Sequence, residues 1–395
     1  MNKFFCRISN LCKNKKGDLI VIALFVVLCF LLNLFSLELP VRVHNDGYKC
    51  KGVITAIDNS QIVSHALVSA GEQLVKVKLL NGPRAGEEVD AVNMLRSNLD
   101  LDKVFAVGDI AWVGVLEKGD GTIQHVNAQD HYRLEDAAWL FGIFALFLLI
   151  FGGLTGVKAL LSFVFSCQVI WQLTIPLCLK GWSPIWVCFG AVALLSAVII
   201  FAVNGFRGKG VTAFSGTMLG VGASCLMAIA FTHLFRINGA VMPYSQALYY
   251  SGYEFLNLTD LFIGAIFLAS SGAVMDLATD VAAGMQEVVR ENPEISTIRL
   301  MASGFRIGRL VVGTMTTTLL LAYSGGYLTV MMSFAAEGVA MSDFLNFPYV
   351  AAEVVKTLIG SLGLVLVAPF TALCGGVLLK KHGEHIVKTV SKERI

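Results

Sequence analysis

Long apolar segments recur along this chain of 395 residues and set the strongest limit on its fold. A helix of about 20 apolar residues is long enough to cross the hydrocarbon core of a bilayer. Hydrophobic residues make up 56% of the chain and charged residues only 15%, which is too little charge for the surface of a soluble protein of this length. The sequence therefore predicts an α-helical polytopic membrane protein with about eight transmembrane helices. The first covers residues 19–39, and the others lie near 138–156, 158–179, 183–203, 211–235, 259–279, 305–330 and 352–379.

Basic residues precede the first apolar segment, as they do in a secretory signal peptide. No small-residue cleavage pattern follows before Glu38 and Pro40, so we predict a retained anchor at 19–39 behind a cytoplasmic basic arm at 1–18. Lysine and arginine concentrate on the cytoplasmic side of membrane proteins. With eight spans both termini lie on one side, together with the basic tail at 381–395. The basic residues that fall on this side are Arg207, Lys209, Arg290, Arg299, Lys380, Lys381, Lys388, Lys392 and Arg394.

Residues 40–136 differ in composition from the rest of the chain and predict a small β-rich domain. Val75, Val77 and Leu79 alternate with Lys76 and Lys78, which is typical of a strand with one apolar and one polar face. The segment 110–128 predicts a hairpin that turns at 118–121, and five or six short strands favour a barrel or a sandwich. The charge distribution places this domain outside the cytoplasm, ahead of a membrane domain of about seven helices at 137–380.

Several function classes are excluded or weakened by what the chain lacks. A net charge of +2 argues against nucleic-acid binding, which needs a concentrated basic surface. The nine cysteines show neither a zinc-site spacing nor a disulfide framework. No nucleophile, metalloprotease or phosphate-loop motif is present, so we expect no enzymatic activity, and the sequence identifies no cofactor.

Two aspartates stand out within the apolar segments. Asp276 and Asp280 are four residues apart and therefore share one face of a helix. Carboxylates there could bind a divalent metal ion or relay a proton. In the alternative interpretation, Arg306 and Arg309 at the start of the next span neutralise them as buried ion pairs. The sequence leaves both interpretations open.

A run of hydroxyl side chains follows the two arginines. Thr314 and Thr318 share a face with Thr317 beside them, which could form a polar lining near the middle of the bilayer. Each threonine could instead bond to a carbonyl of its own helix. Further along, Glu353 and Lys356 are three residues apart, and we expect them to pair with each other.

The segments 271–276 (SGAVMD), 307–319 (IGRLVVGTMTTTL) and 353–363 (EVVKTLIGSLG) resemble the YibE/F-like family of bacterial integral membrane proteins. The resemblance spans most of the chain, because members also carry an outward β-rich insert after a first anchor. It implies a multi-pass bacterial membrane protein, and the charge distribution adds the expectation of a plasma-membrane protein with cytoplasmic termini. It sharpens the expected architecture more than the mechanism.

Two functional hypotheses follow. In the first, the chain transports or exports a small charged solute, with a divalent metal ion or a proton as the best candidate for what meets Asp276 and Asp280. In the second, the membrane domain is a scaffold or assembly factor, and the outward β domain binds an envelope partner or a ligand. The lipid bilayer is the one partner that the sequence predicts directly, and it does not predict an oligomeric state.

Overall fold

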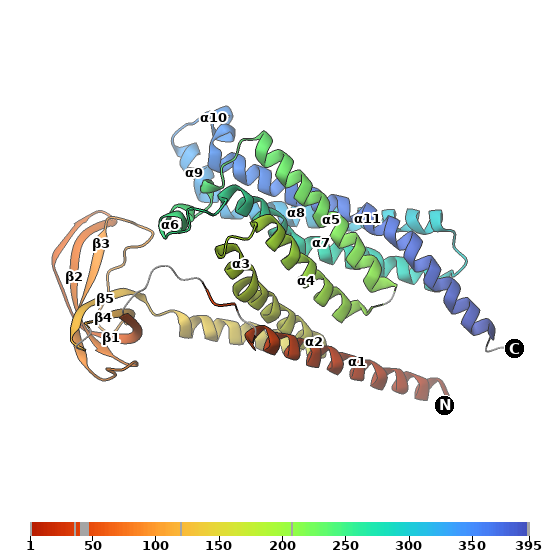
Figure 1. Cartoon of the computed structure of the whole chain (residues 1–395), viewed down its shortest axis with the longest axis horizontal. Coiled ribbons are helices and arrows are strands. Elements are labelled where there is room, and N and C mark those ends of the chain that lie inside the picture. Colours follow the sequence, from red (N-terminus) through yellow and green to blue (C-terminus); the bar gives the residue numbers. More distant parts are fainter. Residues whose placement is uncertain (1, 35–36, 40–46, 119–120, 207, 393–395) are drawn as a thin grey trace. The chain divides into compact units, whose positions relative to one another are not determined.

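The protein is described by a computed structural model (Figure 1), which covers residues 2–34, 37–39, 47–118, 121–206 and 208–392, with side chains described between 18 and 380. Arg207, Arg394 and positions 119–120 of the predicted hairpin turn lie outside the described residues. The chain divides into two compact units. One comprises Met1–Pro40 with Leu154–Ile395, and the other comprises Val41–Gly153.

Five strands of the second unit close into a barrel in the order β1-β2-β3-β5-β4. Neighbours pair antiparallel except β3 and β5, which meet in parallel at Val92 and Asn127. Alternate residues point inward, as in β3, where Val89, Ala91 and Leu95 are buried. The prediction of a small barrel is confirmed, whereas its position outside the cytoplasm stays a prediction. The strands are β1 Gly47–His65, β2 Val68–Leu79, β3 Glu88–Arg96, β4 Ile110–Glu117 and β5 Ile123–His131.

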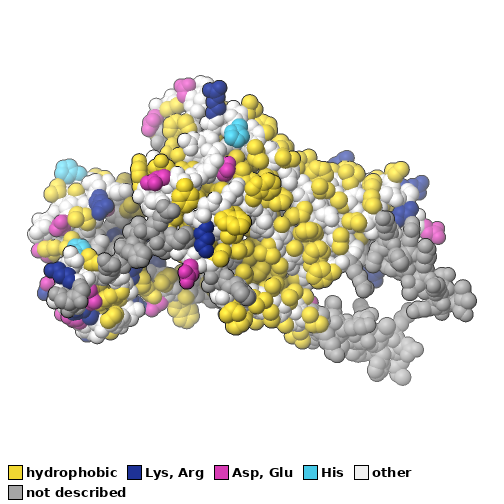
Figure 2. Space-filling model, viewed as in Figure 1, with side chains coloured by type: hydrophobic (Ala, Val, Ile, Leu, Met, Phe, Trp, Pro, Cys, Tyr) yellow, Lys and Arg dark blue, Asp and Glu magenta, His cyan; other side chains and the backbone are white. Residues whose placement is uncertain are grey.

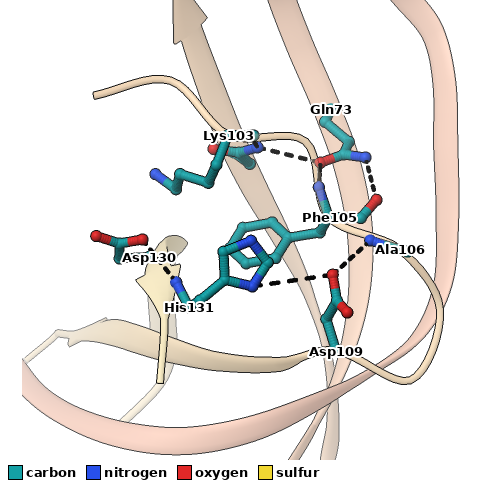
Figure 3. A network of polar contacts seen from close by, with 8 residues as sticks. Gln73, Lys103, Phe105, Ala106, Asp109, Asp130 and His131 are labelled. Carbon is teal, nitrogen blue, oxygen red and sulfur yellow. Dashed lines mark hydrogen bonds and ion pairs between the residues drawn. The ribbon is translucent and has the colours of Figure 1, made fainter. Parts of the chain in front are cut away.

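A buried polar network fixes one loop of the barrel to its wall (Figure 3). The Gln73 side chain is fully buried, and its Oε1 accepts hydrogen bonds from the backbone N of Phe105 at 2.9 Å and from Asn93 Nδ2 at 3.0 Å. Its Nε2 donates to the Phe105 carbonyl at 2.9 Å. A buried amide is costly unless it is hydrogen-bonded. The network therefore holds Phe105 in place as part of the barrel core.

Helix α2 (Leu134–Gln168) is interrupted at Gly153, where the units divide. Its φ of 53° and ψ of −129° are not helical, and a positive φ favours glycine.

The part of α2 before Gly153 begins next to the barrel, where Glu135 forms an ion pair with Lys51 at 2.5 Å. In the first unit, Phe165 packs edge-to-face against Phe25 of α1 (Asn2–Leu34), with the ring centroids 6.0 Å apart.

Six described helical stretches are long and apolar enough to cross a membrane. One of them, Leu134–Leu179, contains the interruption at Gly153, and α1 adds a shorter apolar stretch, Asp18–Leu34. The predicted total of eight spans stays a prediction. After α2 the elements are η1 Val169–Thr174, α3 Ile175–Leu179, α4 Pro184–Asn204, α5 Lys209–Leu234, η2 Gly239–Val241, α6 Ser245–Tyr250, α7 Leu258–Glu291, α8 Thr297–Gly326, α9 Leu328–Ala336, α10 Met341–Asn346 and α11 Pro348–Lys392.

Helix α7 lies at the centre of the helical unit and α8 at its edge. Helix α7 packs against α4, α5, α8 and α11, and 61% of its most apolar stretch is buried. The corresponding share for α8 is only 6%. Figure 2 shows hydrophobic side chains over much of the visible helical surface, as expected for helices that face lipid.

Glycines allow α8 to approach its two neighbours closely. A Cβ atom at Gly304 would lie 2.6 Å from the Sδ of Met285 in α7 and 2.8 Å from the Cβ of Ala372 in α11. At Gly308 a Cβ would lie 2.7 Å from the Cβ of Ala368. Membrane helices without intervening lipid gain stability from this kind of close packing.

We expect Gly304→Ala to lower the free energy of unfolding by about 1–3 kcal/mol, because the added methyl overpacks the α7–α8–α11 contact. Gly190→Ala in α4 is the control, since a Cβ there meets nothing within 4 Å. Denaturation of the purified full-length variants in detergent measures both. Equal stability of the two variants would contradict the packing described here.

Candidate functional site

Asp276 and Asp280 lie one turn apart on the exposed side of α7. The opposite side of the helix carries Leu277, Ala278 and Val281, which are fully buried in the core. The carboxylates share one face of the helix, as the spacing of four residues predicted, and this face lies outside the packed core of the helical unit.

Arg306 and Arg309 do not cap these aspartates. Among the described residues, no ion pair joins either arginine to Asp276 or Asp280. The cause is the rotation of α8, since Gly304 contacts both neighbouring helices and Arg306, two residues on, points to the opposite side. The Arg306 Nε donates only to the carbonyl of Ala302 in its own helix, at 3.4 Å.

The three predicted threonines lie exposed on α8, and each bonds to its own helix. The hydroxyls of Thr314, Thr317 and Thr318 donate to the carbonyls of Val311, Gly313 and Thr314 at 3.0, 3.1 and 3.0 Å. Each hydroxyl proton is therefore used, while the oxygen keeps lone pairs that can accept from a ligand or coordinate a cation.

The contacts between α7 and α8 show which residues of the two helices lie at the same level along the helix axes. A Cβ at Gly308 would lie 3.5 Å from Val281, and one at Gly304 would touch Met285, so the two helices run antiparallel in this register. Continuing it by one to two turns places Thr314 at the level of Asp276. Thr314 and Thr318 are on the α7 side of α8, because they follow Ile307, which contacts Gly284, by two and three turns.

Asp276 and Asp280 are the two carboxylates of this surface that could ligate a divalent cation. Among the residues that the structure describes, no group of three or more His, Cys, Asp or Glu side chains is placed to hold a metal ion. The remaining ligands would be water or the hydroxyl and carbonyl oxygens nearby, which suits a hydrated, weakly held ion better than a fixed metal centre.

A second polar cluster lies between α8 and α11. Glu353 and Lys356 form an ion pair at 3.4 Å, as their spacing predicted, and the Lys356 ammonium lies 5.1 Å from the centre of the Tyr323 ring. A cavity of about 200 Å³ adjoins Glu353 and is otherwise mostly apolar. Sequence reasoning missed this cavity, because α9 and α10 complete its wall through Met331 and Phe344.

The barrel carries a cluster of charged groups around Phe105 (Figure 3). The His131 ring packs edge-to-face on Phe105, and its Nδ1 lies 3.9 Å from Asp109 Oδ2. The Lys103 side chain extends toward Asp130, and burial lowers the pKa of Lys103 while the Asp130 charge partly opposes this. A hydrogen bond from Arg133 lowers the pKa of the Asp130 carboxyl, which keeps that charge in place.

We predict that the Lys103 amine reacts with an acylating reagent at lower pH than an ordinary lysine. Burial disfavours its ammonium form, so the neutral amine is present at a pH where other amines are protonated. The pH midpoint of labelling, followed by mass spectrometry, should fall below the usual 10.5. Asp130→Asn should lower the midpoint further, because it removes a charge that favours the ammonium. A midpoint at or above 10.5 would contradict the assignment.

Comparison with known proteins identifies the helical unit. The family model described as YibE/F-like protein matches residues 140–381, which is more than half of the chain and includes both aspartates, the threonine run and the Glu353–Lys356 pair. No curated protein and no solved structure matches the chain. With its several apolar helices, the chain is a multi-pass membrane protein that belongs to the YibE/F-like family.

Proposed function

We propose that this protein transports a small charged solute across the bacterial plasma membrane, and that Asp276 and Asp280 meet a divalent metal ion or a proton on its path. In this proposal the termini are cytoplasmic and the barrel is extracytoplasmic. The distribution of lysine and arginine along the sequence supports that orientation. The activity is transport rather than catalysis.

One observation carries the proposal: two carboxylates lie on one side of an apolar helix with no ion pair to them among the described residues. An ionised carboxylate costs roughly 2.5–3.5 kcal/mol at the centre of a membrane helix on insertion scales, and Asp276 and Asp280 lie toward the end of the predicted span 259–279, where part of this cost applies. A residue that serves only packing would not carry this cost. A cation or proton that binds and leaves offsets it for part of the transport cycle.

The surroundings of Asp276 suit a passing cation. Thr314 lies at the same depth on the neighbouring helix, and its hydroxyl oxygen can accept or coordinate while its proton is bound to Val311 O. Gly272 lies one turn away on the same face, and the position where its Cβ would be is open. Oxygen ligands and open space together allow an ion to keep part of its hydration shell.

We expect Asp276→Asn to abolish flux while the protein stays folded. The amide removes the charge that attracts the cation but keeps the shape of the side chain. Purified protein in liposomes would be tested with Mn²⁺ against an internal metal-sensitive dye, and with a pH gradient against an internal pH dye. Glu287→Gln is the control, because Glu287 is on the same helix, is exposed and already lies 3.7 Å from Arg290.

Loss of flux in Asp276→Asn with wild-type flux in Glu287→Gln would support the proposal. Wild-type flux of both probes in Asp276→Asn, at equal protein content, would end the assignment of this residue. No flux of either probe in the wild-type protein would exclude both candidate solutes.

The scaffold hypothesis is favoured by one feature of the barrel. A surface pocket of about 270 Å³ is lined by Tyr48, Lys49, His125, Asn127 and Gln129, a set rich in hydrogen-bonding groups. These groups could orient a polar ligand in the pocket, whose lining also includes Val115 and Leu116. In this hypothesis the barrel does the binding and the helices hold it at the membrane.

Deleting residues 41–135 separates the two hypotheses. If the barrel is the working part, we expect the deletion to remove the cellular phenotype of the gene, and Asp276→Asn to leave that phenotype unchanged. If the helical unit transports the solute, Asp276→Asn alone should reproduce the phenotype of a full deletion. Growth of the complemented deletion strain under metal stress measures both variants.

A further inference from the structure

The outward side of α8 carries charges that the described part of the chain leaves without an ion-pair partner. Arg306, Arg309 and Thr317 all lie exposed on this side, away from Gly304 and the packed core. From these positions we propose that α7 and α8 form a homodimer interface, in which Arg309 of each copy pairs with Asp280 of the other.

Contact with lipid would be unfavourable for the charged side chains of this surface. Only 6% of the most apolar stretch of α8 is buried, so this stretch keeps an exposed side even though α8 packs against α7 and α11. Guanidinium and carboxylate groups within membrane helices are normally turned toward the protein interior or toward a partner group. The exposed charges on α7 and α8 therefore indicate a surface that another protein covers.

The charges cannot satisfy each other within one copy. Asp280 lies beside the side of α7 that contacts α8, whereas Arg309 is on the far side of α8 from that contact. Rotating α8 to bring the arginine round would move Gly304 and Gly308 out of contact with Met285, Ala368 and Ala372. The glycine contacts thus keep the two charges apart.

A twofold axis along the membrane normal brings them together. Such an axis leaves the depth of every residue unchanged, and an interface about it uses the same surface on both copies. Val281 contacts the Gly308 position, so their neighbours Asp280 and Arg309 lie at nearly the same depth. Arg309 of each copy then meets Asp280 of the other, which gives two equivalent ion pairs. For this reason we infer that a second copy of the chain covers this surface.

Small residues leave room for close approach of the second copy. A Cβ built at Gly313, one turn from Arg309, meets nothing within 4 Å, and the same holds for Gly272 on the exposed side of α7. Unfilled glycine positions next to polar groups are typical of membrane helix interfaces.

This inference does not rest on the proposed transport function. In the dimer Asp280, the second carboxylate of the proposed cation path, is paired with Arg309, so that Asp276 is the carboxylate left to meet the cation. The two proposals can therefore fail separately, since loss of the dimer is measured without any solute and loss of flux is measured in Asp276→Asn.

The test is a charge exchange between copies. Full-length protein carrying a donor or an acceptor fluorophore at the C-terminus is mixed in liposomes, and energy transfer reports the dimer. We expect Asp280→Arg alone and Arg309→Asp alone to lower the dimer fraction by about tenfold, because each homodimer then faces like charges. Mixing the Asp280→Arg protein with the Arg309→Asp protein should restore energy transfer, because both pairs regain opposite charges.

Glu287→Arg is the matched control, and it should dimerise like the wild-type protein, because Glu287 lies beyond the proposed pair near the end of α7. If either charge reversal prevents folding, Asp280→Asn and Arg309→Gln are used in place of the charge-reversed variants. Each should weaken the dimer, and mixing the two neutral variants should not restore energy transfer. A monomeric wild-type protein at every protein-to-lipid ratio would overturn the proposal and indicate another covering partner. Wild-type energy transfer in both charge variants, or no recovery in their mixture, would overturn it as well.

Discussion

Close packing at glycines is the constraint on which the rest of the helical unit depends. Gly304 and Gly308 bring α8 against α7 and α11, and Gly216 and Gly220 of α5 do the same toward Thr371 and Val367 of α11. Between helices in lipid, van der Waals contact replaces the hydrophobic effect as the main attraction. These contacts fix how α5, α8 and α11 are rotated around the central helix α7.

The rotation of α8 explains the electrostatics of the unit. Because the glycine side faces inward, the arginines and Thr317 face outward, and the two aspartates of α7 have no basic partner within the described chain. The fold thus keeps acidic and basic groups of similar depth on different sides of α7 and α8 and out of mutual reach. A protein that needed only stability would gain by pairing them or by replacing them with apolar residues.

The barrel follows a different rule, because water replaces lipid as its solvent. Alternation along each strand builds an apolar interior. Backbone groups of the 103–105 segment pair with both ends of the buried Gln73 amide and with the Asn93 Nδ2, while the buried Asn93 Oδ1 has no hydrogen-bond partner among the described residues. This pairing presents Lys103 at the surface beside Phe105, where burial and the Asp130 charge act on it in opposite directions. The polar groups of this unit are thus ordered by the fold, whereas those of α8 are left exposed by it.

The sequence by itself determined the apolar helices, a small β-rich domain between the first and second apolar segments, the shared face of Asp276 and Asp280, and the Glu353–Lys356 pair. These are local properties, since hydropathy and the helical or strand period act within one segment. The tertiary structure alone decided that the β-rich domain is a barrel and not a sandwich, that Arg306 and Arg309 turn away from the aspartates and that α9 and α10 line an open pocket beside Glu353. Periodicity tells which residues share a face but not which neighbour that face meets, because contacts between distant segments choose the rotation of each helix.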